Sequence, residues 1–417
     1  MGVEALVLFA ERLRGLDRSN MKDFTFRNPA TAVMGGSAAR RHDGPFSVCR
    51  ALALAVLIVA LGLAGCAAFP EEDGIGGVPV ETAQSDAPSS EDVPGDEFNG
   101  AASAAQGESE MTMNEQAGGE TADVLFPEEL LTIPASYSEP CETPGHLERL
   151  DYDTYEAFSY ADRTQPLSKY AIVYVPAGYD PTQSCNVVYL MHGGWSDQTT
   201  FLGTPEAPSA FKNQIDHAMA DGVIKPCLIV CPTYNNTSPD DAADYSLALE
   251  LTARYPQELV GDLMPAVAAA YSTYAADGTP EALAASRDHR AFMGFSMGSV
   301  TTWHIFESCL AYFRYFAPAS GNAGSGAYWA DAVRRQGFGA EDFLIIGATG
   351  TDDFNGSAFA AQMQDMAANP LFHEGDGEAG CNLIFRIGEG ERHDGQAANR
   401  YMYNALAFLW RGGAATE

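Results

Sequence analysis

The chain contains 417 residues, of which 56 are acidic and 23 are basic, so its formal net charge at pH 7 is −33. This balance argues against nucleic acid as a partner, because phosphate binding requires clustered lysine and arginine. The length exceeds that of a usual single domain, whereas the hydrophobic fraction of 46% is ordinary for a globular protein. We therefore expect one large domain together with sequence outside it.

The first predicted element is an apolar segment near the amino terminus. Residues 51–64 form a run of 14 apolar residues, preceded by Arg40, Arg41 and Arg50. Such a run is too short to span a bilayer comfortably and is typical of the core of a signal peptide. The following Leu-Ala-Gly-Cys, residues 63–66, resembles a bacterial lipobox. The resemblance implies cleavage before Cys66, lipidation of Cys66 and a membrane anchor facing away from the cytoplasm; an uncleaved anchor helix is the alternative.

An acidic segment follows the lipobox. Residues 67–129 contain 16 aspartates and glutamates and no lysine or arginine. Such a segment buries too little apolar surface to offset its ordering entropy, and its like charges extend it. The sequence therefore predicts a signal peptide with a lipobox in residues 1–65, a lipid-anchored disordered linker in residues 66–129 and a folded domain in residues 130–417. An acidic ligand-binding arm is the alternative reading of the linker.

The folded domain begins with two stretches, 147–158 and 168–176, that alternate as half-buried antiparallel strands do. Short apolar strands and helical patterns then alternate along the chain. The strands are expected at 186–191, 226–231, 289–295, 315–319, 342–348 and 382–387, and the helices at 207–221, 257–274, 297–311, 357–368 and 395–410. This alternation predicts an α/β fold with a mostly parallel central sheet and helices on both faces, as in an α/β-hydrolase.

A Gly-x-Ser-x-Gly motif, Gly294-Phe-Ser-Met-Gly298, joins strand 289–295 to helix 297–311. In this context the serine lies on a tight, strained turn with its hydroxyl exposed. The glycines are needed because the strand and helix backbones approach so closely that a Cβ would clash. We predict that Ser296 is a nucleophile, although the motif alone is a weak signal and needs further residues to support it.

A serine nucleophile needs a base to take its proton and a third group to orient that base. In α/β-hydrolases the acid and then the histidine follow the serine, each after a strand. Strand 342–348 is followed by Asp352 and Asp353, and strand 382–387 by His393. We predict Asp353 as the acid and His393 as the base, with Asp352 capping the next helix. The competing histidines do not follow a late core strand: His146, His192, His217, His289, His304 and His373.

Acyl transfer also passes through an oxyanion that needs two fixed N–H donors, each worth ~3 kcal/mol of barrier. One predicted donor is the backbone N–H of Met297, at the positive end of its helix. The second belongs to the loop after strand 186–191, where Gly193 and Gly194 allow an N–H to turn towards the ester. His192 is expected to support this loop. An ordinary Gly-Gly turn is the alternative.

Six motifs together resemble the esterase D-like proteins of carbohydrate esterase family 1, over roughly residues 145–411. They lie in residues 188–194, 258–265, 290–298, 315–321, 350–353 and 393–394. The resemblance implies a triad of Ser296, Asp353 and His393. It favours Asp353 over Asp352, because in the related Gly-Thr-Asn-Asp pattern the second acidic-type position is the catalytic one.

The family includes feruloyl and acetylxylan esterases, mycolyltransferases and S-formylglutathione hydrolases. A lipid anchor facing away from the cytoplasm argues against a glutathione thioester and favours small-molecule or polysaccharide esters at the cell surface. We therefore expect a serine carboxylic-ester hydrolase of the feruloyl or acetyl esterase type. The alternatives are an acyltransferase of the mycolyltransferase type and a surface lipoprotein that binds glycans without catalysis.

Aromatic residues near the expected active-site loops are candidates for stacking on a phenolic acyl group or a sugar ring. They are Trp195, Phe201, Trp329 and Phe354. Ordinary packing is an equal alternative for each of them. We select Trp195 and Phe354 as the candidate substrate-binding residues.

Eight cysteines are present, at positions 49, 66, 141, 185, 227, 231, 309 and 381. Without Cys49 and Cys66, the remaining six allow fifteen pairings, and the sequence does not choose among them. Cys227 and Cys231 lie on one strand, too far apart to bridge each other. The paired Cys-x-x-Cys spacing of zinc sites does not occur. We expect no metal and no organic cofactor.

Overall fold

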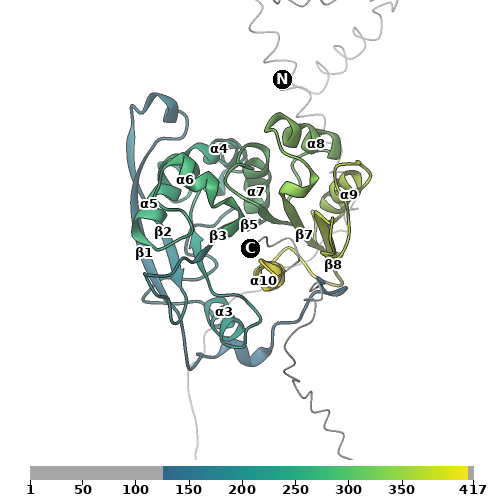
Figure 1. Ribbon diagram of the computed structural model, residues 1–417, viewed down its shortest axis with the longest axis horizontal. Coiled ribbons are helices and arrows are strands. Elements are labelled where there is room, and N and C mark those ends of the chain that lie inside the picture. The colour runs from purple at the N-terminus through teal and green to yellow at the C-terminus, as the bar shows by residue number, and fades with distance from the viewer. Residues whose placement is uncertain (1–124, 412–417) are drawn as a thin grey trace, which may run out of the picture. The chain divides into compact units, whose positions relative to one another are not determined.

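The computed structural model describes residues 125–411 (Figure 1). The expected signal peptide, the lipidation site Cys66 and nearly all of the predicted linker lie outside the described residues, as do residues 412–417. Within residues 125–411, each helix is too short or too polar to cross a membrane. The six cysteines of this part of the chain are all free thiols.

An eight-stranded sheet forms the centre of the described domain. Its strands are β1 (His146–Tyr155), β2 (Pro166–Val175), β3 (Asn186–Met191), β4 (Cys227–Cys231), β5 (Arg290–Phe295), β6 (Tyr315–Ala319), β7 (Leu344–Gly350) and β8 (Leu383–Gly388). The spatial order is β1-β2-β4-β3-β5-β6-β7-β8. Strand β2 is antiparallel to both of its neighbours, and the six strands from β4 to β8 are parallel. The predicted mostly parallel sheet is therefore confirmed.

Residues 125–411 contain eight α-helices, the last of which follows β8. They are α3 (Ala210–Ala220), α4 (Tyr245–Glu258), α5 (Met264–Ala270), α6 (Pro280–Ala285), α7 (Met297–Ser308), α8 (Gly326–Arg335), α9 (Gly356–Ala367) and α10 (Gly395–Phe408). Short 3₁₀ turns lie at Ala135–Ser138, Tyr160–Asp162, Asp241–Ala243, Arg287–His289 and Ala340–Asp342.

The helix expected over 257–274 differs from the observed one. Helix α4 starts at Tyr245, where the Asp244 side chain accepts a hydrogen bond from the Leu247 N–H, and it contains Pro256. A π-helical turn, Leu259–Leu263, then joins α4 to α5. Since proline usually marks a first helical turn, the sequence pattern placed the start of the helix too late. Helix α8 was also not expected.

Helices cover both faces of the sheet (Figure 1). Because successive side chains of a strand point to opposite faces, Phe292 and Met293 of β5 belong to two separate cores. Phe292 lies in the core with residues of α4, α5, α7, α8 and α9. Met293 lies in the core with residues of α3 and α10. The sheet is thus buried on both sides, which explains its continuous apolar strands.

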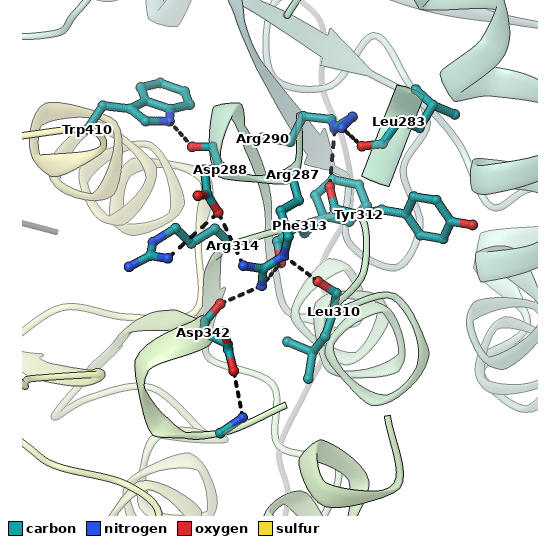
Figure 2. Close-up of polar contacts among 11 residues, drawn as sticks. Leu283, Arg287, Asp288, Arg290, Leu310, Tyr312, Phe313, Arg314, Asp342 and Trp410 are labelled. Carbon is teal, nitrogen blue, oxygen red and sulfur yellow. Dashed lines mark hydrogen bonds and ion pairs between the residues drawn. The ribbon is translucent and has the colours of Figure 1, made fainter. Parts of the chain in front are cut away.

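The amino ends of β5, β6 and β7 are joined by Arg287, in the turn before β5 (Figure 2). Its Nε donates to the carbonyl of Leu310 at 2.8 Å, and its Nη2 donates to the carbonyl of Phe313 at 3.2 Å. Nη2 also donates to the carbonyl of Asp342, in the turn before β7. One guanidinium therefore satisfies carbonyls from the segments that lead into two neighbouring strands.

The neighbouring Arg290 plays a similar part (Figure 2). It donates to the carbonyl of Leu283 and, at 3.2 Å, to the carbonyl of Tyr312. Burial lowers the pKa of Arg290 to about 10, so this side chain is still charged at neutral pH. Asp288 lies 3.7 Å from Arg314 and adds an ion pair to the same group.

Candidate active site

Ser296 lies on the turn between β5 and α7, with φ 59° and ψ −118°. This positive φ is a strained conformation for serine and is typical of functional turns. A Cβ on Gly298 would lie 2.3 Å from the Met191 carbonyl oxygen, and a Cβ on Gly294 would lie 2.5 Å from the Gly298 oxygen. Both positions are closed to larger residues by backbone atoms, which explains the glycines of the motif.

The backbone ladder of the sheet continues one residue beyond the strands at this edge. The Ser296 N–H donates to the Ala319 carbonyl at 2.9 Å, and the Ser320 N–H donates to the Ala348 carbonyl at 3.0 Å. The Thr351 N–H donates to the Gly388 carbonyl at 3.0 Å. The ends of β5, β6, β7 and β8 are thereby held in register around Ser296.

His393 and Asp353 converge on Ser296 from the loops after β8 and β7. His393 Nε2 is 2.8 Å from Ser296 Oγ, and His393 Nδ1 is 2.9 Å from each oxygen of Asp353. The Asp353 side chain is fully buried, and that of His393 is 14% exposed. An acceptor-only carboxylate at Nδ1 leaves Nε2 free to accept the serine proton.

Of the two adjacent acids, Asp353 contacts the histidine. Its Oδ1 also accepts a hydrogen bond from the Asn355 N–H at 2.7 Å, which fixes the carboxylate. Asp352 is exposed, and its N–H donates to the Glu391 carbonyl. Asp352 does not cap α9, whose N-cap residue is Asn355. The geometry therefore separates the two candidates by their partners.

The loop after β3 brings Gly193 next to the nucleophile. A Cβ on Gly193 would lie 3.5 Å from Ser296 Cβ, in ordinary van der Waals contact. Within residues 125–411, the backbone N–H groups of Gly193, Gly194 and Met297 donate to no protein acceptor. Met297 is the first residue of α7, where the helix presents unsatisfied N–H groups and a positive dipole end. The predicted oxyanion donors thus lie in two segments that both border Ser296.

The loop rests on His192, which is 1% exposed. Its Nδ1 donates to the Gly193 carbonyl at 2.7 Å, and its Nε2 accepts from the Thr233 hydroxyl at 2.7 Å. Burial lowers the pKa of His192 to about 4, so the ring is neutral at pH 7. Tyr234 also donates to the Gly193 carbonyl. Sequence reasoning missed Thr233 and Tyr234; the only signal was a polar pair soon after the buried strand β4.

The aromatic candidates separate into two groups. Trp195 and Phe354 are 73% and 81% exposed, and the Phe354 ring centroid lies 4.2 Å from that of His393. In contrast, Phe201 is buried and packs near Phe211, and Trp329 is buried and stacks on Trp303. These last two residues are core residues and are not available to a substrate. Within residues 125–411, no cluster of histidine, cysteine or carboxylate side chains is arranged to hold a metal.

The serine, histidine and buried carboxylate at the carboxyl edge of this sheet define the α/β-hydrolase class of serine hydrolases. Residues 169–332 match the model of the Esterase family, described as a putative esterase.

Known relatives agree with this assignment. The chain is 32% identical over 290 residues to endo-1,4-β-xylanase Y of Acetivibrio thermocellus. The match covers 66% of this chain and 24% of the xylanase, so the chain spans about a quarter of that relative. It is 29% identical to a mutant of the feruloyl esterase module from Clostridium thermocellum complexed with sinapinate. The TM-score is 0.59, and the match covers 72% of this chain and 99% of that one.

A ferulic acid esterase of carbohydrate esterase family 1 from Anaeromyces mucronatus has the same fold. Its TM-score is 0.50 at 18% identity, with 68% of this chain and 97% of that chain covered. The α/β-hydrolase fold and the resemblance to carbohydrate esterase family 1, both predicted from the sequence, are therefore confirmed.

Proposed function

We propose that the protein is a serine carboxylic-ester hydrolase that acts on feruloyl or acetyl esters linked to polysaccharide. The observation that carries this proposal is the hydrogen-bonded chain from Ser296 Oγ through His393 to Asp353, at 2.8 and 2.9 Å. Beside it, the N–H groups of Gly193, Gly194 and Met297 donate to no acceptor in residues 125–411. This combination supplies a nucleophile, its base and donors for an oxyanion.

In the first half-reaction, Ser296 Oγ attacks the ester carbonyl carbon while its proton passes to His393 Nε2. The Asp353 carboxylate holds the imidazole through Nδ1–H and stabilises its positive charge. Backbone N–H groups of Met297 and the 193–194 loop bind the oxyanion. The bond to the alcohol then breaks, and His393 gives its proton to the leaving oxygen, which leaves an acyl group on Ser296.

In the second half-reaction, water replaces the alcohol. His393 takes a proton from the water as its oxygen attacks the acyl carbon, and a second oxyanion forms in the same place. When this intermediate collapses, the proton returns to Ser296 Oγ and the carboxylic acid leaves. The cycle needs the three side chains and the backbone donors, and it consumes one water molecule per ester.

The choice of acyl group rests on the exposed aromatic side chains and on the relatives. Trp195 and Phe354 lie on loops beside the reacting groups and offer apolar surface to a phenolic ring. The Clostridium thermocellum module of similar sequence is a feruloyl esterase complexed with sinapinate. The similarity of this chain to endo-1,4-β-xylanase Y of Acetivibrio thermocellus suggests xylan as the polymer that carries the ester.

We further propose that the enzyme is attached to the cell surface through lipidated Cys66. The lipobox of residues 63–66 and the acidic segment after it support this location. Expression of the full chain in a bacterium that processes lipoproteins tests it. The protein is expected in the membrane fraction, whereas Cys66→Ala is expected in the soluble fraction; equal distribution of the two would contradict the anchor.

The direct test of the chemistry is hydrolysis of p-nitrophenyl acetate. Replacement Ser296→Ala removes the nucleophile and is expected to lower kcat by ~10³-fold or more. Ser308→Ala removes an exposed hydroxyl from the same helix α7 and serves as the matched control with unchanged kcat. Equal rates for wild type and Ser296→Ala would overturn the proposed function and favour a glycan-binding lipoprotein.

Two product assays then define the substrate. Release of ferulate or acetate from arabinoxylan identifies the acyl group, and we expect ferulate to be released. Incubation of the ester with and without added sugar distinguishes hydrolysis from transfer. Free acid as the sole product supports hydrolysis, whereas an esterified sugar would support the mycolyltransferase type of reaction.

A further inference from the structure

The three residues that follow Pro232 after β4, Thr233, Tyr234 and Asn235, contact the loop after β3 at successive positions. The Thr233 hydroxyl donates a hydrogen bond to His192, and the Tyr234 hydroxyl donates one to the Gly193 carbonyl. The side-chain amide of Asn235 donates a hydrogen bond to the Ser196 carbonyl. The loop that borders the nucleophile is thus fixed from outside at three points. The triad does not account for these contacts.

We propose that Tyr234 is a positioning residue that holds the Gly193 carbonyl so that the N–H of Gly194 faces the reacting ester oxygen. The inference rests on the proposed ester hydrolysis and adds a residue to it. Tyr234 does not touch the substrate in this proposal. It acts through the peptide between Gly193 and Gly194.

The geometry of a peptide bond links the two ends of this contact. In a trans peptide the C=O of one residue and the N–H of the next point in opposite directions. The described residues contain no cis peptide bond. The Gly193 carbonyl accepts from Tyr234 Oη at 2.7 Å and from His192 Nδ1 at 2.7 Å. The Gly194 N–H therefore points away from both rings, and it donates to no protein acceptor in residues 125–411.

Two consecutive glycines need such an external restraint. Fixing the backbone of one residue costs roughly 1–2 kcal/mol, and glycine has the most freedom to lose. Tyr234 is 2% exposed, and its ring stacks on that of His192 with centroids 4.5 Å apart. Burial raises the pKa of Tyr234, so the phenol keeps the proton that it donates. The donor is therefore rigid and present throughout the neutral pH range.

The support behind Tyr234 is a buried ion pair. Lys169 Nζ donates to the Thr233 carbonyl at 2.8 Å and lies 2.6 Å from Glu258. Tyr152 donates to the same Glu258 carboxylate at 2.7 Å. Both charged side chains are at least nine-tenths buried. The segment that carries Tyr234 is thus tied to β1, β2 and α4 by contacts that do not involve the loop after β3.

The test is Tyr234→Phe, which keeps the ring and its stacking and removes only the donor. We expect kcat for p-nitrophenyl acetate to fall about 10- to 100-fold with KM changed less than about twofold. The reason is that a misplaced Gly194 N–H stabilises the oxyanion of the transition state less well, while binding of the ester itself is little affected. Inhibition by an aryl trifluoromethyl ketone, which forms an oxyanion on Ser296, is expected to weaken by a similar factor. The pH profile of kcat/KM keeps its midpoint, because His393 and Asp353 are untouched.

Tyr255→Phe is the matched control. The Tyr255 hydroxyl is buried and has no hydrogen-bond partner in the described part of the chain. Its removal is expected to leave kcat within about twofold of wild type. A Tyr234→Phe enzyme with wild-type kcat, or one that binds the ketone as tightly as wild type, would overturn the inference. Failure of the proposed function looks different, since wild type would then be as inactive as Ser296→Ala and both proposals would fall.

Discussion

The two edges of the parallel sheet are built in opposite ways. At the carboxyl edge, residues just after β3, β5 and β6 adopt positive φ: Trp195 at 53°, Ser296 at 59° and Ser320 at 54°. At the amino edge, Arg287 and Arg290 donate to backbone carbonyls and hold the strand starts together (Figure 2). Strained residues cost about 1–3 kcal/mol each and persist only where the surroundings over-determine them. The backbone bonds at the carboxyl edge and the two cores supply that constraint.

The comparison predicts its largest effect at the carboxyl edge, where side chains serve chemistry. Asp353→Asn replaces an acceptor of Nδ1–H by an amide and favours the wrong tautomer of His393, so kcat is expected to fall about 10⁴-fold. The exposed neighbour provides the control, since Asp352→Asn is expected to stay within a few-fold of wild type. The measurement is kcat with p-nitrophenyl acetate, and a larger loss for Asp352→Asn would reverse the assignment of the acid.

At the amino edge, substitution is expected to change stability and leave chemistry intact. Arg287→Met leaves three carbonyls without their charged donor and is expected to lower the free energy of unfolding by about 4 kcal/mol. Arg335→Met removes an exposed arginine that pairs with Asp331 on α8, and it is expected to cost less than about 1 kcal/mol. Urea unfolding gives both values.

A folded Arg287→Met enzyme whose kcat fell as strongly as that of a triad variant would contradict the view that the amino edge serves stability and the carboxyl edge serves catalysis. We expect its kcat, measured below the unfolding transition, to equal that of wild type. The carbonyls it serves, those of Leu310, Phe313 and Asp342, precede β6 and β7 and lie at the end of the sheet away from Ser296.

A smaller effect is expected from His192, a buried polar group of the carboxyl edge. Its pKa is about 4 in the folded protein and 6.5 in the ordinary case, so between these pH values the unfolded chain binds a proton that the folded one excludes. Stability is therefore unaffected by this group above pH 6.5, and it falls by about 3 kcal/mol as the pH drops to 4.

Urea unfolding of wild type and His192→Gln across this range checks the value. The variant is expected to be less stable at pH 7 but to lose stability less steeply between pH 6.5 and 4. Above pH 7 the two proteins are expected to have parallel profiles, which serves as the internal control. Parallel profiles below pH 6.5 as well would show that His192 does not cause the acid sensitivity.

The sequence was most informative about the positions of the buried strands and about the order of the candidate triad residues along the chain. Strands β3 and β6 coincide with the expected 186–191 and 315–319, because continuous apolar runs bounded by polar residues leave little freedom. Asp353 and His393 could be predicted as the acid and the base because each follows a core strand in the order typical of the fold, and the structure places the two side chains in hydrogen-bond contact. Helix α4 was misplaced because Pro256 lies inside it, where tertiary packing outweighs the local preference of proline.

The sequence could not reveal contacts that depend on the spatial order of the strands. Thr233 and Tyr234 reach the Gly193 loop because β4 lies beside β3. The sequences of the two segments do not predict that these strands are neighbours in the sheet. Burial of Trp329 was equally hidden. Its helix α8 packs against α7 and α9, so an aromatic residue that the chain order places near the site belongs to the core.

The backbone ladder that passes from Ser296 to Ala319, from Ser320 to Ala348 and from Thr351 to Gly388 has an evolutionary consequence. The distance between Ser296 and Asp353 is set by the spacing of the strands that precede them. The tips of the surrounding loops do not determine this distance. Loop tips such as those bearing Trp195 and Phe354 are therefore free to diversify. Related enzymes can therefore evolve to accept esters with a different alcohol or a different acyl group while the reacting side chains keep the same arrangement.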